Sequence, residues 1–139
     1  MTPTLMGRVQ SRLIIVLLVG LPWTLLLGPF LPAGEAALSD VYSMIFRAVF
    51  IVAIIGAVLW EPVYHFIQQY RWEKDWPTGL GLITALPEGI VVYLLLGDNV
   101  PTAAFLWHFI TTWLLIWFVL NGPIRVLLPR WRFRGGRIV

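Results

Sequence analysis

Three ionisable side chains lie inside apolar stretches that are long enough to cross a membrane. They are Arg47 in the stretch 41–65, Glu88 in 79–96 and His108 in 102–120. Counted at about 1.5 Å per residue from the outer end of each stretch, all three lie about 10–12 Å deep, and Thr24 of the first stretch lies at the same level. A guanidinium, a carboxylate and an imidazole at one level could pair, relay a proton, or hold an ion or a polar headgroup.

The matching depths predict an intramembrane polar cluster in which Arg47 and Glu88 form an ion pair with His108 beside them. A charged side chain at the centre of a membrane span costs about 2.5–3.5 kcal/mol, so such groups face protein, water or one another. Three interpretations of the cluster stay open. It locks the helices together, it forms a site for an ion, proton or headgroup, or it faces a partner.

The residue types needed for most other chemistry are missing. The chain has no cysteine, which excludes disulfides and thiolate catalysis or ligation. No nucleophile with its base, no metal cluster and no phosphate loop is visible, so we expect no enzyme, no cofactor and no metal site. His65 and His108 differ too much in depth to ligate one haem together. The basic pI arises mostly in the tail and does not indicate nucleic acid.

Composition indicates the elements that must position the cluster. Hydrophobic residues make up 59% of the chain and charged residues 12%, about half the charge of a soluble domain. We expect an all-α integral membrane protein: a single domain, 1–139, with a basic tail, 121–139. It has four transmembrane helices, at approximately 13–32, 41–65, 79–96 and 102–120. The alternative for the first stretch is a cleaved signal peptide, although its apolar run is longer than a signal core.

The positive charges predict an orientation. Lys and Arg residues gather before the first stretch, between the second and third, and after the fourth, whereas the other two gaps hold Glu35, Asp40 and Asp98. The positive-inside rule then places both termini and the central loop in the cytoplasm. We expect the protein in the bacterial cytoplasmic (inner) membrane. Arg47 is the one basic residue inside a span.

Two basic segments could contact something outside the chain. The central loop packs four charges and two tryptophans into the six residues Arg71, Trp72, Glu73, Lys74, Asp75 and Trp76, a composition that suits partner docking as well as an aromatic belt at the headgroups. The tail carries Arg125, Arg130, Arg132, Arg134 and Arg137, which we expect to lie along the anionic lipid surface. A cytoplasmic partner is the alternative for the tail.

These features favour a non-catalytic subunit or scaffold of a larger membrane complex. The aromatic helix 102–120 would hold it in the assembly and the central loop would dock, so the expected partners are lipids, other subunits or further copies of the chain. The alternative is a small ion- or proton-coupled transporter or channel subunit that uses Glu88.

Overall fold

The computed structural model describes residues 2–97 and 100–137, and helix makes up 77% of these residues. The described residues contain no strand. The helical elements are α1 (Leu5–Ile15), η1 (Val16–Gly20), α2 (Leu21–Leu27), η2 (Gly28–Phe30), α3 (Leu38–Ile55), η3 (Gly56–Trp60), α4 (Glu61–Gln69), α5 (Leu80–Ile83), α6 (Ala85–Leu96), α7 (Thr102–Asn121), α8 (Pro123–Leu127) and α9 (Pro129–Phe133). The predicted all-α class is confirmed.

Consecutive elements join into three continuous helices that are long and apolar enough to cross a membrane. These helices are Leu5–Phe30, Leu38–Gln69 and Thr102–Leu127, with 26, 32 and 26 residues. The remaining apolar stretch, Leu80–Leu96, is the third along the chain. It is shorter than the other three helices and is interrupted at Thr84, between α5 and α6. The first helix begins eight residues before the predicted span, so Arg8 and Arg12 belong to it rather than to a flanking loop.

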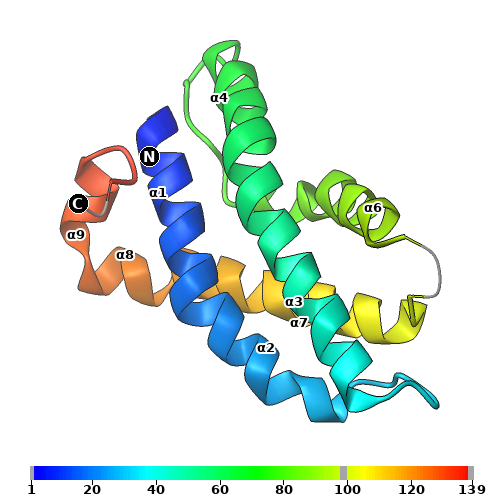
Figure 1. Cartoon of the computed structure of the whole chain (residues 1–139). Coiled ribbons are helices and arrows are strands. Elements are labelled where there is room, and N and C mark those ends of the chain that lie inside the picture. The colour runs from blue at the N-terminus through cyan, green and yellow to red at the C-terminus, as the bar shows by residue number, and fades with distance from the viewer. Residues whose placement is uncertain (1, 98–99, 138–139) are drawn as a thin grey trace.

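The first two long helices lie side by side, and α7 crosses behind them (Figure 1). The short helix α6 packs against α3 on the side away from α1. Between α3, α6 and α7 lies an apolar core. Its buried side chains are Met44, Ile45, Ala48, Val92, Leu96, Ala104, Phe105 and Phe109. Most other large apolar side chains point outward, as expected of helices solvated by lipid.

Both long N-terminal helices contain a π-helical turn just before a proline. The π-helix η1 precedes Pro22, and η3 precedes Pro62. Proline has no N–H and its ring crowds the carbonyl four residues earlier, so the helix widens locally instead of breaking. The widened turn η3 begins with Gly56, where an added Cβ would lie 2.6 Å from Arg12 Cδ. Gly56 therefore leaves room for the Arg12 side chain.

The two ends of the chain pack together. The backbone N–H of Thr4 donates to Gly135 O at 2.8 Å, and the Ser11 hydroxyl donates to Gly136 O at 2.7 Å. The indole N–H of Trp131, which is buried, donates to Ser11 Oγ at 2.6 Å. The tail therefore folds back as α8 and α9 against the start of α1, and α1 lies between α9 and α4 (Figure 1).

We predict that Gly56→Ala destabilises the fold by about 1–3 kcal/mol, because the new methyl group overpacks against Arg12. Gly20→Ala is the matched control. Gly20 belongs to the other π-helical turn, and its added Cβ would meet Ile116 at an ordinary 3.5 Å. We expect Gly20→Ala to be neutral or slightly stabilising, since alanine favours helix. Unfolding in mixed micelles with SDS, followed by circular dichroism, measures both, and equal effects would contradict the prediction.

Candidate functional site: an enclosed ion-pair cluster beside an open cavity

The Arg12 guanidinium lies between two carboxylates from different helices. Its Nε donates to Glu61 Oε1 at 2.7 Å, while Nη1 and Nη2 donate to Glu88 Oε2 and Oε1 at 2.7 and 2.9 Å. The contact with Glu88 is thus a two-point, fork-like pair, the strongest geometry available to these groups. The Tyr64 hydroxyl also donates to Glu88 Oε1, at 3.0 Å. Both oxygens of Glu88 are therefore engaged, and the residue is 1% exposed.

Arg8 extends this cluster toward the central loop. Its Nη1 lies 3.4 Å from Glu61 Oε2, and its Nη2 donates to Gln68 Oε1 at 2.6 Å. The Arg8 guanidinium also stacks over the Trp76 ring, with Cζ 4.4 Å from the ring centroid. Gln68 in turn donates to Lys74 O at 2.7 Å. The cluster thereby ties the loop after α4 to α1.

Local helix geometry explains why these side chains meet. Arg8 and Arg12 are one turn apart on α1 and share a face. On α4 the residues Glu61, Tyr64 and Gln68 follow at intervals of three and four, which also gives one face. Glu88 lies in the first turn of α6, directly after Pro87. Two arginines and two glutamates leave the cluster neutral, which keeps the burial of four charges tolerable.

The predicted ion pair between Arg47 and Glu88 is not formed. Glu88 pairs with Arg12, and Arg47 is exposed on α3, with no carboxylate of the described residues within 4 Å of it. The reason is depth: Arg12 Nη1 lies 3.4 Å from Val52 O, so Glu88 sits near Val52, about 7 Å along the helix from Arg47. Counting from the end of each stretch gives only a depth, and it misses that Arg47 faces outward while Arg12 of the first helix reaches Glu88.

His108, the third member of the predicted cluster, lies elsewhere, with Thr24. The Thr24 Oγ and His108 Nε2 atoms are 2.9 Å apart, and both residues are buried. Two of the four residues predicted to share a level are therefore in contact. His108 Nδ1 and Thr112 Oγ have no hydrogen-bond partner among the described residues, and both residues line a cavity of about 20 Å³. That space suits one water molecule, for which about 10–15 Å³ suffices.

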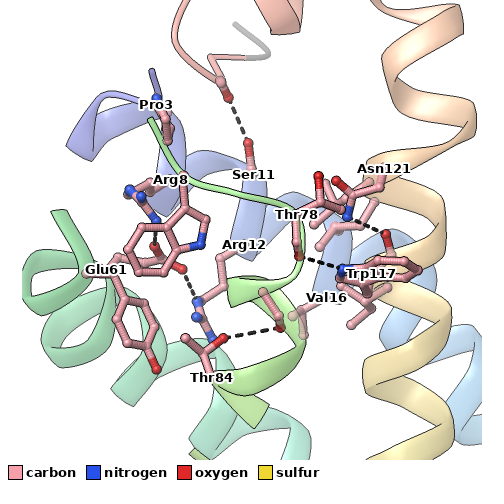
Figure 2. Close-up of a pocket in the computed structure, with 18 of the residues that line it drawn as sticks. Pro3, Arg8, Ser11, Arg12, Val16, Glu61, Thr78, Thr84, Trp117 and Asn121 are labelled. Atoms are coloured by element: carbon pink, nitrogen blue, oxygen red, sulfur yellow. Dashed lines mark hydrogen bonds and ion pairs between the residues drawn. The ribbon is translucent and has the colours of Figure 1, made fainter. Parts of the chain in front are cut away.

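A larger cavity of about 190 Å³ opens beside the ion-pair cluster. Figure 2 shows Arg8, Arg12 and Glu61 on one side of it, with Trp117 and Asn121 of α7 on the other and Thr78 between. The indole N–H groups of Trp113 and Trp117 donate to Gly81 O at 2.8 Å and to Thr78 O at 3.0 Å. These bonds hold the segment 77–84 against α7 and shape the cavity wall.

The predicted docking loop is divided between surface and interior. Trp72 is fully exposed, and Glu73 and Lys74 are exposed too. Arg71 pairs with Asp75, four residues later in the loop, at 3.4 Å. Trp76, by contrast, turns inward beneath Arg8 and lines the cavity. Only the first part of the loop is thus available for a partner.

The predicted lipid-facing tail is also divided. Arg130, Arg134 and Arg137 are exposed, whereas Arg125 lines the cavity and its Nη2 lies 3.4 Å from Thr78 Oγ. Arg132 is part of α9.

Within residues 2–97 and 100–137, no group of three or more His, Asp or Glu side chains is arranged to hold a metal ion.

Sequence reasoning missed the central residues of the site, Arg8, Arg12, Glu61 and Gln68, as one cluster. Arg8 and Arg12 looked like positive charges flanking the first span. A signal was present nevertheless: a polar face on 61–68 opposite two arginines with the same helical spacing.

Comparison with known proteins adds nothing to the assignment, because no family model, no curated protein and no solved structure matches the chain.

We predict that Glu88→Gln lowers the free energy of unfolding by about 3 kcal/mol, because it leaves the buried Arg8 and Arg12 with one carboxylate between them. Arg47→Gln removes the charge of an exposed residue and should change the free energy of unfolding by less than about 0.5 kcal/mol. SDS titration of both variants in mixed micelles makes the comparison. If Arg47→Gln proved as damaging as Glu88→Gln, the pairing described above would be contradicted.

Proposed function

We propose that the chain is a non-catalytic subunit of a larger membrane complex, and that Arg47 binds a carboxylate on a transmembrane helix of a partner subunit. One observation carries the proposal. Arg47 is an exposed cation about 13 Å from the start of α3, within a helix that is otherwise apolar enough to span a membrane. Left facing lipid, it would cost about 2.5–3.5 kcal/mol.

The surroundings of Arg47 suit a helix-shaped partner. Ser43, Arg47, Phe50 and Ile54 recur at intervals of three and four and are all exposed, so they form one stripe along α3. The stripe has one charge, one small polar residue and two large apolar side chains. A partner helix that carries a carboxylate within an apolar sequence complements such a stripe in charge and in packing.

The environment of Glu88 supports a subunit over a transporter. A transporter that works through Glu88 needs a carboxylate that can release its protein partners and bind a proton or a cation. Here both oxygens of Glu88 are held by Arg12 and Tyr64, and Glu88 itself does not line the larger cavity. These contacts suit a residue that locks helices together. Exposed Trp72 in the central loop is a second, peripheral contact for the partner.

The proposal includes four spans with both termini in the cytoplasm of a bacterial cell. The stretch Leu80–Leu96 would be the third span; it is about 25 Å long at the usual helical rise, which nearly matches a hydrocarbon core about 30 Å thick. The distribution of Lys and Arg supports this orientation. Arg8 and Arg12 lie at the proposed cytoplasmic end, where both are paired with carboxylates in the ion-pair cluster.

We predict the labelling pattern of single cysteines introduced into this cysteine-free chain at exposed positions. Ala36→Cys should react with a membrane-impermeant thiol reagent from outside the cell, whereas Trp72→Cys and Phe133→Cys should react only after the membrane is opened. If Leu80–Leu96 failed to cross, the tail would lie outside. Labelling of Phe133→Cys in intact cells would therefore contradict the four-span arrangement.

The partner is tested by photo-crosslinking in the native host from Phe50 and Ile54 on the α3 stripe. Leu17 and Leu18, which are equally exposed on the first helix, serve as controls. We expect the stripe, and not the control positions, to capture one membrane protein whose crosslinked helix contains Asp or Glu. Arg47→Gln should reduce capture at least fivefold.

Three results would contradict the proposed partner. They are crosslinks only to lipid, crosslinks only to a second copy of this chain, and capture that Arg47→Gln leaves unchanged. Solute flux is measured in liposomes that contain only the purified chain. Flux that Glu88→Gln abolishes, while the variant remains folded, would favour the transporter.

A further inference from the structure

We propose that the larger cavity binds one anionic amphiphile, with a phosphate-bearing headgroup at Arg125 and an apolar chain against α7. This site is separate from the Arg47 stripe, and the proposal does not depend on the partner. It depends on the charge of the cavity, on the order of polar and apolar groups along its wall, and on its size.

The charge at the cavity is not balanced. Three arginines line it, but Arg8 and Arg12 are neutralised by Glu61 and Glu88 within the ion-pair cluster. Arg125 is left over, because no carboxylate of the residues that the structure describes lies within 4 Å of it. A net positive charge at a partly enclosed site attracts an anion.

The groups around Arg125 suit a phosphate in particular. A guanidinium presents two parallel N–H donors that match two phosphate oxygens. The Thr78 hydroxyl, which lies 3.4 Å from Arg125 Nη2, can turn its own hydrogen toward the same ligand. Asn121, one turn before Arg125, uses its amide nitrogen for Trp117 O at 2.8 Å and retains a second N–H.

The wall becomes apolar away from Arg125. Trp113, Ile116, Trp117 and Leu120 lie at helical spacing on α7 and line the cavity. The indole N–H groups of Trp113 and Trp117 already donate to backbone carbonyls. A ligand in the cavity would therefore meet only the apolar surface of these two rings. From Trp113 to Leu120 the wall rises about 10 Å along α7, and the charged group of Arg125 follows in α8, beyond Gly122. A ligand that follows this wall needs one charged end and one apolar end.

The cavity has room for more than an ion. Its volume of about 190 Å³ is on the order of a dozen times the space that one water needs. Phosphate with an apolar chain is the chemistry of an anionic phospholipid from the adjacent leaflet, and a soluble phosphate monoester shares only the headgroup. The two sources can be separated with defined probes.

Native mass spectrometry of the purified chain tests the proposal with phosphatidylglycerol, phosphatidylcholine and glycerol 3-phosphate as probes. We expect one phosphatidylglycerol per chain and at least tenfold weaker binding of phosphatidylcholine. Arg125→Gln should weaken phosphatidylglycerol binding at least tenfold. Arg130→Gln makes the same charge change at an exposed tail position and should alter it less than twofold.

Leu120→Trp tests the location of the ligand, because it fills the cavity without changing charge. It should abolish phosphatidylglycerol binding while circular dichroism shows an unchanged helix content. Equal losses in Arg125→Gln and Arg130→Gln would overturn the site in favour of general surface charge. Binding of phosphatidylcholine as tight as that of phosphatidylglycerol would overturn the requirement for an anion. Glycerol 3-phosphate bound as tightly as the lipid would overturn the role of the apolar wall.

Discussion

The structure depends on the neutralisation of the Arg12 guanidinium by Glu61 and Glu88 inside an apolar molecule. An unpaired charge inside a lipid bilayer has no water to solvate it, so each buried charge needs a partner from the chain itself. This requirement joins α1, α4 and α6 at one point. It also explains Gly56, which leaves the space that Arg12 occupies.

The helices could be predicted from the sequence because hydropathy and length alone define a helix in lipid. The proximity of Thr24 and His108 was also predictable, since both were counted to the same level of their stretches. The partner of Glu88 was not. Residue counting gives a level but not the face of the helix on which a side chain lies, and Arg47 faces outward while Glu88 meets Arg12.

The arginines were misread for a related reason. The sequence predicts that the arginines near the chain start flank the first span, whereas Arg8 is buried and the Arg12 side chain is 11% exposed. The mid-span position of Arg47 predicts a buried side chain, yet it faces outward. Orientation about the helix axis decides between these outcomes. Periodicity reveals it only where a polar face is as clear as that of Glu61, Tyr64 and Gln68.

The proposed functions follow from which arginines are paired with carboxylates and which are not. The cluster of two arginines and two glutamates is neutral, and its ion pairs join α1, α4 and α6. Arg47 lies on an exposed stripe of a long apolar helix and Arg125 lines a cavity, and neither has a carboxylate within 4 Å among the described residues. We therefore propose a negative group outside the chain for each, a partner's carboxylate for Arg47 and a phosphate for Arg125.

A double-mutant cycle between Arg12 and Glu88 tests the central claim most directly. Arg12→Gln, Glu88→Gln and the double variant are unfolded with SDS, and a second cycle pairs Arg47→Gln with Glu88→Gln. A contact of this geometry predicts a coupling energy of about 1–3 kcal/mol for Arg12 with Glu88, and additive effects within about 0.5 kcal/mol for Arg47 with Glu88. Additivity in the first cycle together with coupling in the second would contradict the account.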